Sequence, residues 1–351
     1  MKSAFFDKNL KVEIRDIPAP VPEPGQVLIR TVISGTNPKD WKYPKHWGPE
    51  SEPSNHGDDI AGYVESVGEG VVGFRKGDRV AAFHQMWTPY GSYAEYSIAW
   101  AKSAFHLPAN VSFEEAATVP LAAMTASLAL YQKLNMPLPW NRATDRLPLV
   151  VYGGSTAVGS YAIKLARLSN IHPIIAVAGN GSPYVETLLD KSKGDVVIDY
   201  RKGRDHIVEE VRKVGGSDVT HAVDSVSEHG SITTLGKALG KGGKIATVLT
   251  PEMALTGSED PGKSEILFTM VGTVHQEVPA DAALDDRQFG AIFFPFLGQG
   301  LAEGWFKGHP YEVVSGGLDG LQNVLEVLEQ GKISAKKLVL RIDETNGVSS
   351  A

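Results

Sequence analysis

A glycine-rich segment in the middle of the chain has the residue types and the spacing that bind a pyrophosphate. Residues 149–159, LVVYGGSTAVG, pass from an apolar stretch of strand length through a glycine turn into a helix-forming stretch. Gly153 and Gly154 permit a tight turn close to phosphate, Gly159 lets the helix lie against the strand, and free N–H groups at the helix start face the anion. An ordinary strand-to-helix turn, the alternative, would not require this combination. The predicted dinucleotide-binding residues are Gly153, Gly154, Ser155, Thr156, Ala157, Val158 and Gly159.

The end of the next predicted strand indicates which dinucleotide is bound. Enzymes that use NAD usually carry an acidic residue about 20 residues after the glycines, where it binds both ribose hydroxyls. This chain has VAGNGS at 177–182, without a carboxylate to repel a 2′-phosphate, and Asn180 and Ser182 can donate hydrogen bonds to that phosphate. The sequence therefore favours NADPH over NADH. Tyr200 and Arg201, at the end of the following strand, could flank the adenosine phosphate or be plain surface residues.

The composition is that of a globular protein with two domains. Of the 351 residues 42% are hydrophobic and 21% are charged, which is sufficient for two separate cores. The net charge of −7 and the lack of a Lys/Arg run argue against nucleic acid as a partner. The absence of cysteine excludes disulfides, thiolate nucleophiles, iron–sulfur clusters and cysteine-containing zinc sites. Residues 1–7 are typical of a strand, and no apolar run approaches the ~20 residues of a membrane span, so we expect a cytoplasmic protein without a membrane partner.

Two patterns divide the chain into the elements that must position these residues. The first ~120 residues carry short β-like runs separated by Gly and Pro, which predict a strand-dominated, partly open barrel. The pattern turns helical from Ser112, and residues 147–249 then alternate strands with helices, which predicts an α/β fold with a doubly wound parallel sheet. After Val271 we expect irregular structure, then a helix at 318–328 and a strand at 337–342 that return to the first domain.

Several motifs together resemble a known superfamily. They lie at 24–29, 37–42 (NPKDWK), 57–68, 76–80, 91–96, 153–159 and 331–339. On these motifs the chain is similar to the zinc-independent quinone oxidoreductase and enoyl reductase branch of the medium-chain dehydrogenases/reductases. It is especially similar to fungal toxD-like proteins and trans-acting polyketide enoyl reductases. The resemblance implies a GroES-like catalytic domain, a partly open β-barrel at 1–121 and 280–351, and a Rossmann NADPH-binding domain at 122–279.

The chain departs from the zinc alcohol dehydrogenases of that superfamily at every metal ligand. Those enzymes carry a catalytic Cys where residues 35–37 lie here, a His-Glu pair where Asp58 and Asp59 lie, and a structural lobe with four cysteines. Two aspartates alone cannot supply the tetrahedral N/S set that zinc prefers, so no metal site and no Lewis-acid activation of an alcohol is expected. The departure favours reduction of an activated double bond.

Three residues at positions matched to the family are the predicted catalytic residues. Lys42 lies in the motif that lines the nicotinamide cleft in similar enzymes, where an ammonium would stabilise an enolate oxygen; a solvated surface lysine is the alternative. Asn37 would hold the nicotinamide ribose or the substrate, or else cap the turn before Pro38. Thr125 matches a position beside the nicotinamide, where its hydroxyl bonds the carboxamide or the substrate, or else its own helix backbone.

Two cofactor contacts rest on the resemblance alone. Residues 271–274 (VGTV) resemble a late strand whose backbone faces the nicotinamide amide, which places Thr273 in the site. Lys336 or Lys337 resembles a C-terminal cofactor contact. His56, His84 and His275 share no spacing that links them, so each is interpreted as a surface or core histidine rather than an acid.

The resemblance also bears on the substrate pocket and on assembly. The pocket walls are expected from loops at 43–53, 85–90 and 253–263. Relatives commonly dimerise by pairing strand edges, and the apolar stretch 266–274 suits such an edge, so a homodimer is expected with a monomer as the alternative.

Three functions fit these residues. The first is NADPH-dependent reduction of an α,β-unsaturated carbonyl, as in an enoyl or quinone reductase acting without metal. The second is a metal-free aldehyde or ketone reductase, and the third is a non-catalytic, crystallin-like NADPH-binding protein. The substrate would be a small molecule, free or tethered to a carrier protein of a polyketide synthase.

Overall fold

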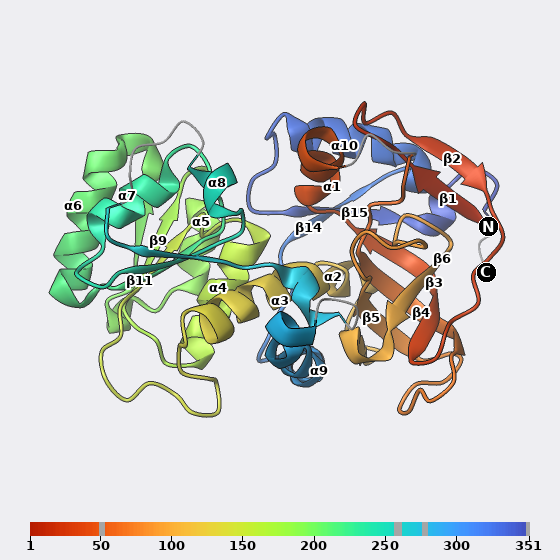
Figure 1. Ribbon diagram of the computed structural model, residues 1–351, viewed down its shortest axis with the longest axis horizontal. Coiled ribbons are helices and arrows are strands. Elements are labelled where there is room, and N and C mark those ends of the chain that lie inside the picture. Colours follow the sequence, from red (N-terminus) through yellow and green to blue (C-terminus); the bar gives the residue numbers. More distant parts are fainter. Residues whose placement is uncertain (49–52, 256–261, 276–279, 349–351) are drawn as a thin grey trace. The chain divides into compact units, whose positions relative to one another are not determined.

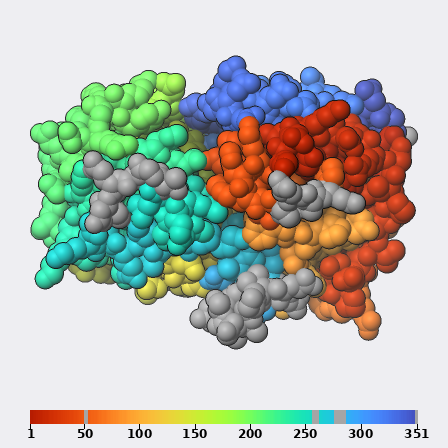
Figure 2. Space-filling model, turned by 45° about the horizontal axis from the view of Figure 1, so that its top comes forward, coloured from red at the N-terminus to blue at the C-terminus, as the bar shows by residue number. Residues whose placement is uncertain are grey.

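The computed structural model of the chain describes residues 1–48, 53–255, 262–275 and 280–348 (Figure 1). Figure 2 shows the same molecule in space-filling form, with the remaining residues in grey. The chain divides into two compact units, Met1–Leu121 with Gly272–Ala351, and Ala122–Val271. Within the described ranges, no helix combines the length and the apolar character that crossing a bilayer requires.

The first unit is built on a mixed seven-stranded sheet in the order β14-β15-β3-β4-β5-β7, with β6 paired to β3. Strands β3 and β4 pair antiparallel with two register shifts, which bend the sheet toward a barrel. Gly62 allows this pairing, because a Cβ there would lie 2.1 Å from the Arg30 carbonyl oxygen. A separate hairpin pairs β1 (Lys2–Phe5) with β2 (Glu13–Asp16). The sheet strands are β3 (Gln26–Gly35), β4 (Asp59–Val67), β5 (Arg79–Phe83), β6 (Tyr96–Trp100), β7 (Ala104–His106), β14 (Tyr311–Val314) and β15 (Lys337–Arg341).

The helices of the first unit are fewer and mostly short. A π-helical turn, Tyr43–Trp47, follows α1 directly. The expectation of irregular structure after Val271 is wrong, since a 24-residue helix, α9, fills most of that region. Residues 271–274 form a 3₁₀ turn and not the late strand that the resemblance suggested. The helices are α1 (Lys39–Lys42), α2 (Phe113–Ala116), α9 (Ala280–Glu303) and α10 (Leu321–Glu329).

The second unit is the doubly wound parallel sheet that the sequence predicts. Its six strands run in the order β10-β9-β8-β11-β12-β13. Because crossovers between parallel strands are right-handed, α4 and α5 cover one face and α6 and α7 cover the other. The strand order reverses between β8 and β11, which is where such sheets bind ligands at their carboxyl ends.

The strands and helices of the second unit lie close to the residues that the alternating pattern predicts. Strand β13 (Glu265–Phe268) lies at an edge of this sheet and overlaps the stretch 266–274 predicted to pair in a dimer, and the dimer itself stays a prediction. The other elements are α3 (Pro120–Ser127), which begins at the end of the first unit, β8 (Leu149–Tyr152), α4 (Ala157–Leu168), β9 (Ile174–Ala178), α5 (Ser182–Leu188), β10 (Val196–Asp199), α6 (Arg204–Gly215), β11 (His221–Asp224), α7 (Ser231–Ala238), β12 (Lys244–Thr247) and α8 (Pro251–Ala254).

Candidate active site

The glycine turn of the second unit has a geometry that suits phosphate binding. Strand β8 ends at Tyr152, and Gly153 turns the chain with a φ of 80°. The backbone N–H groups of Gly153 and Gly154 both donate to the Val177 carbonyl (3.0 and 2.9 Å). Helix α4 begins at Ala157 behind Thr156, whose hydroxyl accepts from the Gly159 N–H (3.0 Å). The positive end of a 12-residue helix is thus held directly after the turn.

Two glycines of this turn have no room for a side chain. A Cβ on Gly159 would lie 2.2 Å from the Gly153 carbonyl oxygen, and a Cβ on Gly153 would lie 2.5 Å from the Ser225 hydroxyl oxygen. Such a turn lets the backbone approach a ligand closely, so these residues fit the pyrophosphate of a dinucleotide.

Ser225 is a residue of this turn that sequence reasoning missed. Its hydroxyl donates to the Tyr152 carbonyl (2.7 Å) and accepts from the Thr156 hydroxyl (2.9 Å). Ser225 follows β11, the strand beside β8, so it lies at the carboxyl edge of the sheet. This position after a predicted strand could have identified Ser225 from the sequence, because residues that follow neighbouring parallel strands meet at one edge of the sheet.

The structure brings together the four residues predicted to bind a 2′-phosphate. Arg201 Nη1 donates to Asn180 Oδ1 (2.5 Å). The Tyr200 ring lies over Gly179, where a Cβ would approach within 2.4 Å of Cε1. The Ser182 hydroxyl donates to the Gly179 carbonyl (2.8 Å). We call Asn180, Ser182, Tyr200 and Arg201 the corner.

The charge of the corner is partly balanced within the protein. Asp199 accepts three hydrogen bonds from the Arg201 guanidinium, from Nε to Oδ1 (2.8 Å) and Oδ2 (3.1 Å) and from Nη2 to Oδ2 (2.6 Å). These bonds lower the pKa of the Asp199 carboxyl to about 2. Arg201 is therefore held in place by Asp199 with its Nη1 group directed at Asn180.

In the first unit, Asn37, Asp59 and Lys337 form a closed group that is at most 5% exposed at any member. The Lys337 ammonium forms an ion pair with Asp59 and donates to Asn37 Oδ1 (3.0 Å). The Asn37 amide donates in turn to Asp59 Oδ2 (2.7 Å). The Leu121 N–H donates to the other oxygen of Asp59 (2.7 Å). The structure thus places Lys337 inside the first unit, and its contact with a cofactor stays a prediction.

A second buried ion group fixes the turn that leads to Lys42. The Lys39 ammonium contacts Asp40 (3.1 Å) and Asp58, and it donates to the His56 carbonyl (2.6 Å). Asp40 also accepts from the Tyr93 hydroxyl (2.6 Å) and from the Asn37 N–H (2.7 Å). Asn37 therefore belongs to both groups, and the turn from Asn37 to Lys42 is held at its start by buried charges.

Asp58 makes this region sensitive to pH. Burial raises the pKa of the Asp58 carboxyl to about 7, although the Lys39 ammonium opposes the shift. The folded state therefore binds a proton that an unfolded chain releases near pH 4. We expect stability from this group below about pH 4, lost progressively as the pH rises to about 7, by roughly 2–4 kcal/mol.

The variant Asp58→Asn tests this pH dependence. Urea unfolding at a series of pH values should show a flatter dependence between about pH 4 and 7 in the variant than in the wild type. The same change at the exposed Asp145 should leave the dependence as it is. An Asp58→Asn variant whose free energy of unfolding depends on pH as in the wild type would contradict the raised pKa of Asp58.

The remaining predicted residues lie in both units. Lys42 ends α1 half-buried, with its ammonium 5.7 Å from the centre of the Trp41 ring. Thr125 lies in α3 and is 5% exposed. Thr273 belongs to the first unit, where its hydroxyl donates to Asp286 Oδ2 (2.7 Å). Their roles in catalysis or cofactor binding stay predictions.

The histidines have structural partners. His84 is 1% exposed, and its Nδ1 donates to the Ile98 carbonyl (2.7 Å). Burial lowers the pKa of His84, and it lowers that of His275 to about 3. Both are therefore neutral at pH 7, as core histidines and not as proton donors.

Comparison with known proteins places this geometry in a family. Residues 23–109 match the model of the alcohol dehydrogenase GroES-like domain. The chain is 44% identical over 320 residues to the trans-enoyl reductase fsr4 of Gibberella fujikuroi, covering 90% of this chain and 91% of that protein. It is 29% identical to the enoyl reductase component lovC of the lovastatin nonaketide synthase of Aspergillus terreus, covering 93% and 92%. The CurK enoyl reductase has the same fold, with a TM-score of 0.75 at 18% identity and coverage of 97% and 98%.

The expected fold and the resemblance are both confirmed by these matches. A GroES-like domain with a mixed sheet and a six-stranded parallel sheet is the architecture of the medium-chain dehydrogenases/reductases. With relatives of this identity along almost its whole length, the chain belongs to the trans-enoyl reductases of the medium-chain dehydrogenase/reductase superfamily.

Proposed function

We propose that this protein is an NADPH-dependent enoyl reductase that acts without metal. It reduces the activated C=C of an α,β-unsaturated acyl group carried as a thioester. The proposal rests on the turn at residues 37–42 of the first unit. This turn ends in Lys42, and Asn37 at its start is hydrogen-bonded to two buried ion groups. A rigid turn fixes the backbone position from which the charged group acts, and such preorganisation favours electrostatic stabilisation of an enolate.

The cofactor supplies a hydride when bound, and the residues of this chain do the rest. The second unit would hold the pyrophosphate at the glycine turn and the 2′-phosphate at the corner, where Asn180, Ser182 and Arg201 are donors. As the β-carbon gains the hydride, the alkene electron pair moves toward the carbonyl oxygen, and the Lys42 ammonium stabilises the charge there. The α-carbon then takes a proton that comes from solvent, which completes the reduction. Asn37 acts by positioning the turn, because both ends of its side-chain amide already have partners.

The surroundings of the aspartates support the metal-free part of the proposal. Asp59 is paired with Lys337, and Asp58 with Lys39. Each of the two carboxylates that stand where zinc enzymes of the superfamily carry a His-Glu pair is thus already paired with an ammonium group. The absence of cysteine from the chain also removes the thiolate ligands that those zinc enzymes use.

The relatives support a tethered substrate. The lovC protein is the enoyl reductase component of a polyketide synthase, and fsr4 is a trans-enoyl reductase. We therefore propose that the acyl group reaches this enzyme on the carrier domain of a separate synthase. An assay of NADPH and NADH oxidation tests the function, with enoyl pantetheine thioesters, quinones and aldehydes as acceptors. Preferred turnover of enoyl thioesters supports the proposal, and turnover of aldehydes alone would replace it with the carbonyl reductase alternative.

The variant Asn180→Asp should reverse the cofactor preference. A carboxylate at the corner would repel a 2′-phosphate and would draw Arg201 into an ion pair. We expect the Kd for NADPH to rise roughly 10- to 100-fold while that for NADH changes little or falls. Titration of both cofactors by fluorescence measures this.

The matched control for the corner is Asn141→Asp, which adds the same charge at another exposed asparagine of the second unit. It should leave both Kd values within about twofold. Unchanged NADPH binding in Asn180→Asp would remove the corner from the cofactor site.

A further inference from the structure

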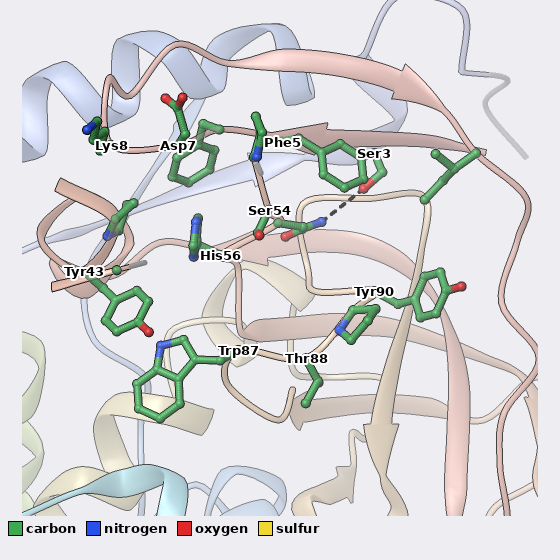
Figure 3. Close-up of a pocket in the computed structure, with 17 residues that line it drawn as sticks. Ser3, Phe5, Asp7, Lys8, Tyr43, Ser54, His56, Trp87, Thr88 and Tyr90 are labelled. Atoms are coloured by element: carbon green, nitrogen blue, oxygen red, sulfur yellow. Dashed lines mark hydrogen bonds between the residues drawn. The ribbon is translucent and has the colours of Figure 1, made fainter. Parts of the chain in front are cut away.

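A cavity of about 400 Å³ lies within the first unit, apart from the ion groups described above (Figure 3). Its described walls come from strand β1 with the residues after it, from residues 43–48 and 53–56, and from the loop after β5. The volume is within the range of about 300–1,000 Å³ that small-molecule sites have. Its aromatic lining residues are Phe5, Phe6, Tyr43, His56, Trp87 and Tyr90.

Two of these aromatic residues are held in a costly backbone conformation. Trp87 and Tyr90 have φ values of 63° and 69°, in the left-handed region that bulky side chains rarely adopt. They are nevertheless 52% and 39% exposed, so burial of their rings does not offset the cost. Strain of this kind persists where a function requires the side chain in one place.

Hydrogen bonds hold the loop that carries Trp87 and Tyr90 in place. The Thr88 hydroxyl donates to the Gln85 carbonyl (2.7 Å), and the Trp100 indole donates to Gln85 Oε1 (2.5 Å). The buried His84 joins the start of the loop to β6 through its bond to Ile98. The two exposed rings are therefore presented by a rigid support.

The wall combines aromatic rings with polar groups and carries no net charge. The rings of Tyr43 and Trp87 lie side by side, with their centres 5.1 Å apart (Figure 3). The ring centres of His56 and Phe6 are 4.9 Å apart. Burial lowers the pKa of His56 to about 4, so it is neutral at pH 7. The Asn55 amide is satisfied by Ser3 Oγ and the Gly91 carbonyl (both 3.2 Å). Among the described lining residues, the charges of Asp7 and Lys8 cancel.

We propose that this cavity binds the distal end of the substrate's acyl chain, the part beyond the reacting double bond. The assignment rests on the proposed function. Tyr43, which lines the cavity, directly follows Lys42 in the chain, so one segment carries both the proposed contact to the substrate carbonyl and part of the cavity wall. The occupant is a neutral, elongated chain, because aromatic rings in a wall without a net charge favour hydrocarbon over phosphate or carboxylate. Trp87 and Tyr43 are thus determinants of chain-length specificity.

The test is the dependence of kcat/KM on chain length, with 2-enoyl pantetheine thioesters of four to twelve carbons and NADPH. Each methylene that enters the cavity should raise kcat/KM about three- to fourfold, until the cavity is full and the curve levels off. The variant Trp87→Gly removes the ring at a position where glycine adopts the native φ without strain. It should lower the ratio of kcat/KM for the ten-carbon over the four-carbon substrate about tenfold.

Two further variants make the outcome specific. Ser54→Phe places a ring at a lining residue and should move the plateau to shorter chains. Trp140→Ala removes another exposed tryptophan, which lies in the second unit and does not line the cavity, and should leave the curve unchanged. A wild-type kcat/KM that is independent of chain length, or a Trp87→Gly curve that matches the wild type, overturns the acyl-tail assignment and leaves the proposed function standing. Absence of turnover with every thioester contradicts the proposed function, and the assignment with it.

Discussion

Replacement of Lys42 by methionine should lower kcat/KM for an enoyl thioester roughly 100- to 1,000-fold. Methionine has a similar length and keeps the helix propensity of the position, so the variant removes the ammonium and little else. A preorganised donor at a developing oxyanion contributes about 3–4 kcal/mol to the transition state, which corresponds to that loss in rate. The loss should lie in kcat, because the charge on the carbonyl oxygen develops in the transition state and not in the bound substrate.

The turn offers a matched control for this prediction. Lys45 lies three residues further on, is exposed, and pairs with Glu329. Lys45→Met should keep kcat/KM within about twofold of the wild type, because an exposed ion pair contributes little. Lys42→Arg should retain part of the activity, and the Kd for NADPH should be the same in all of these variants. A Lys42→Met enzyme within threefold of the wild type would show that the ammonium does not stabilise the enolate.

Replacement of Asp59 by alanine should destabilise the protein by about 3–5 kcal/mol. The change leaves the Lys337 ammonium buried without its carboxylate, and it leaves the Asn37 amide and the Leu121 N–H without their acceptor. An uncompensated charge in a buried site costs more than the ion pair contributed. Urea denaturation measures the change in the free energy of unfolding.

Two variants separate the buried charge from a general loss of packing. The double variant Asp59→Leu/Lys337→Met removes both charges and should recover most of the stability lost in Asp59→Ala. Lys336→Met, which removes the exposed partner of Glu312 at the neighbouring position, should cost less than about 1 kcal/mol. A loss of less than about 1 kcal/mol in Asp59→Ala would mean that this ion group does not anchor the turn.

The sequence predicts those parts of the fold that local pattern determines. The strand, glycine turn and helix at 149–168 follow from a continuous apolar run and from two positions that only glycine can occupy. The corner was also accessible, because its residues follow neighbouring parallel strands and must meet at one edge.

Helix α9 was missed because its local pattern contradicts its structure. It contains Gly290, Gly298, Gly300 and Pro295, each of which lowers helix propensity. Its glycines serve packing: a Cβ on Gly298 would lie 2.9 Å from the Phe105 side chain, and one on Gly300 would lie 2.6 Å from Phe306. Tertiary contacts therefore stabilise a helix that propensity alone disfavours.

The buried ion groups and the cavity were beyond local reasoning for another reason. Asn37 and Lys337 are 300 residues apart in the chain and meet only because β15 pairs with β3. The cavity needs β1, whose neighbour at Phe6 pairs with Ser54. Of the three predicted pocket loops, parts of two line the cavity, and residues 49–52 and 256–261 lie outside the described residues.

Isotopic labelling would follow the hydride to the β-carbon of an enoyl thioester. The protein would be incubated with a 2-enoyl pantetheine thioester and NADPH deuterated at the transferred position, and the product analysed by mass spectrometry and NMR. Enoyl reduction should give a saturated thioester with one deuterium at C3 and a solvent proton at C2. Deuterium on the carbon of an alcohol, with the alkene intact, would contradict it.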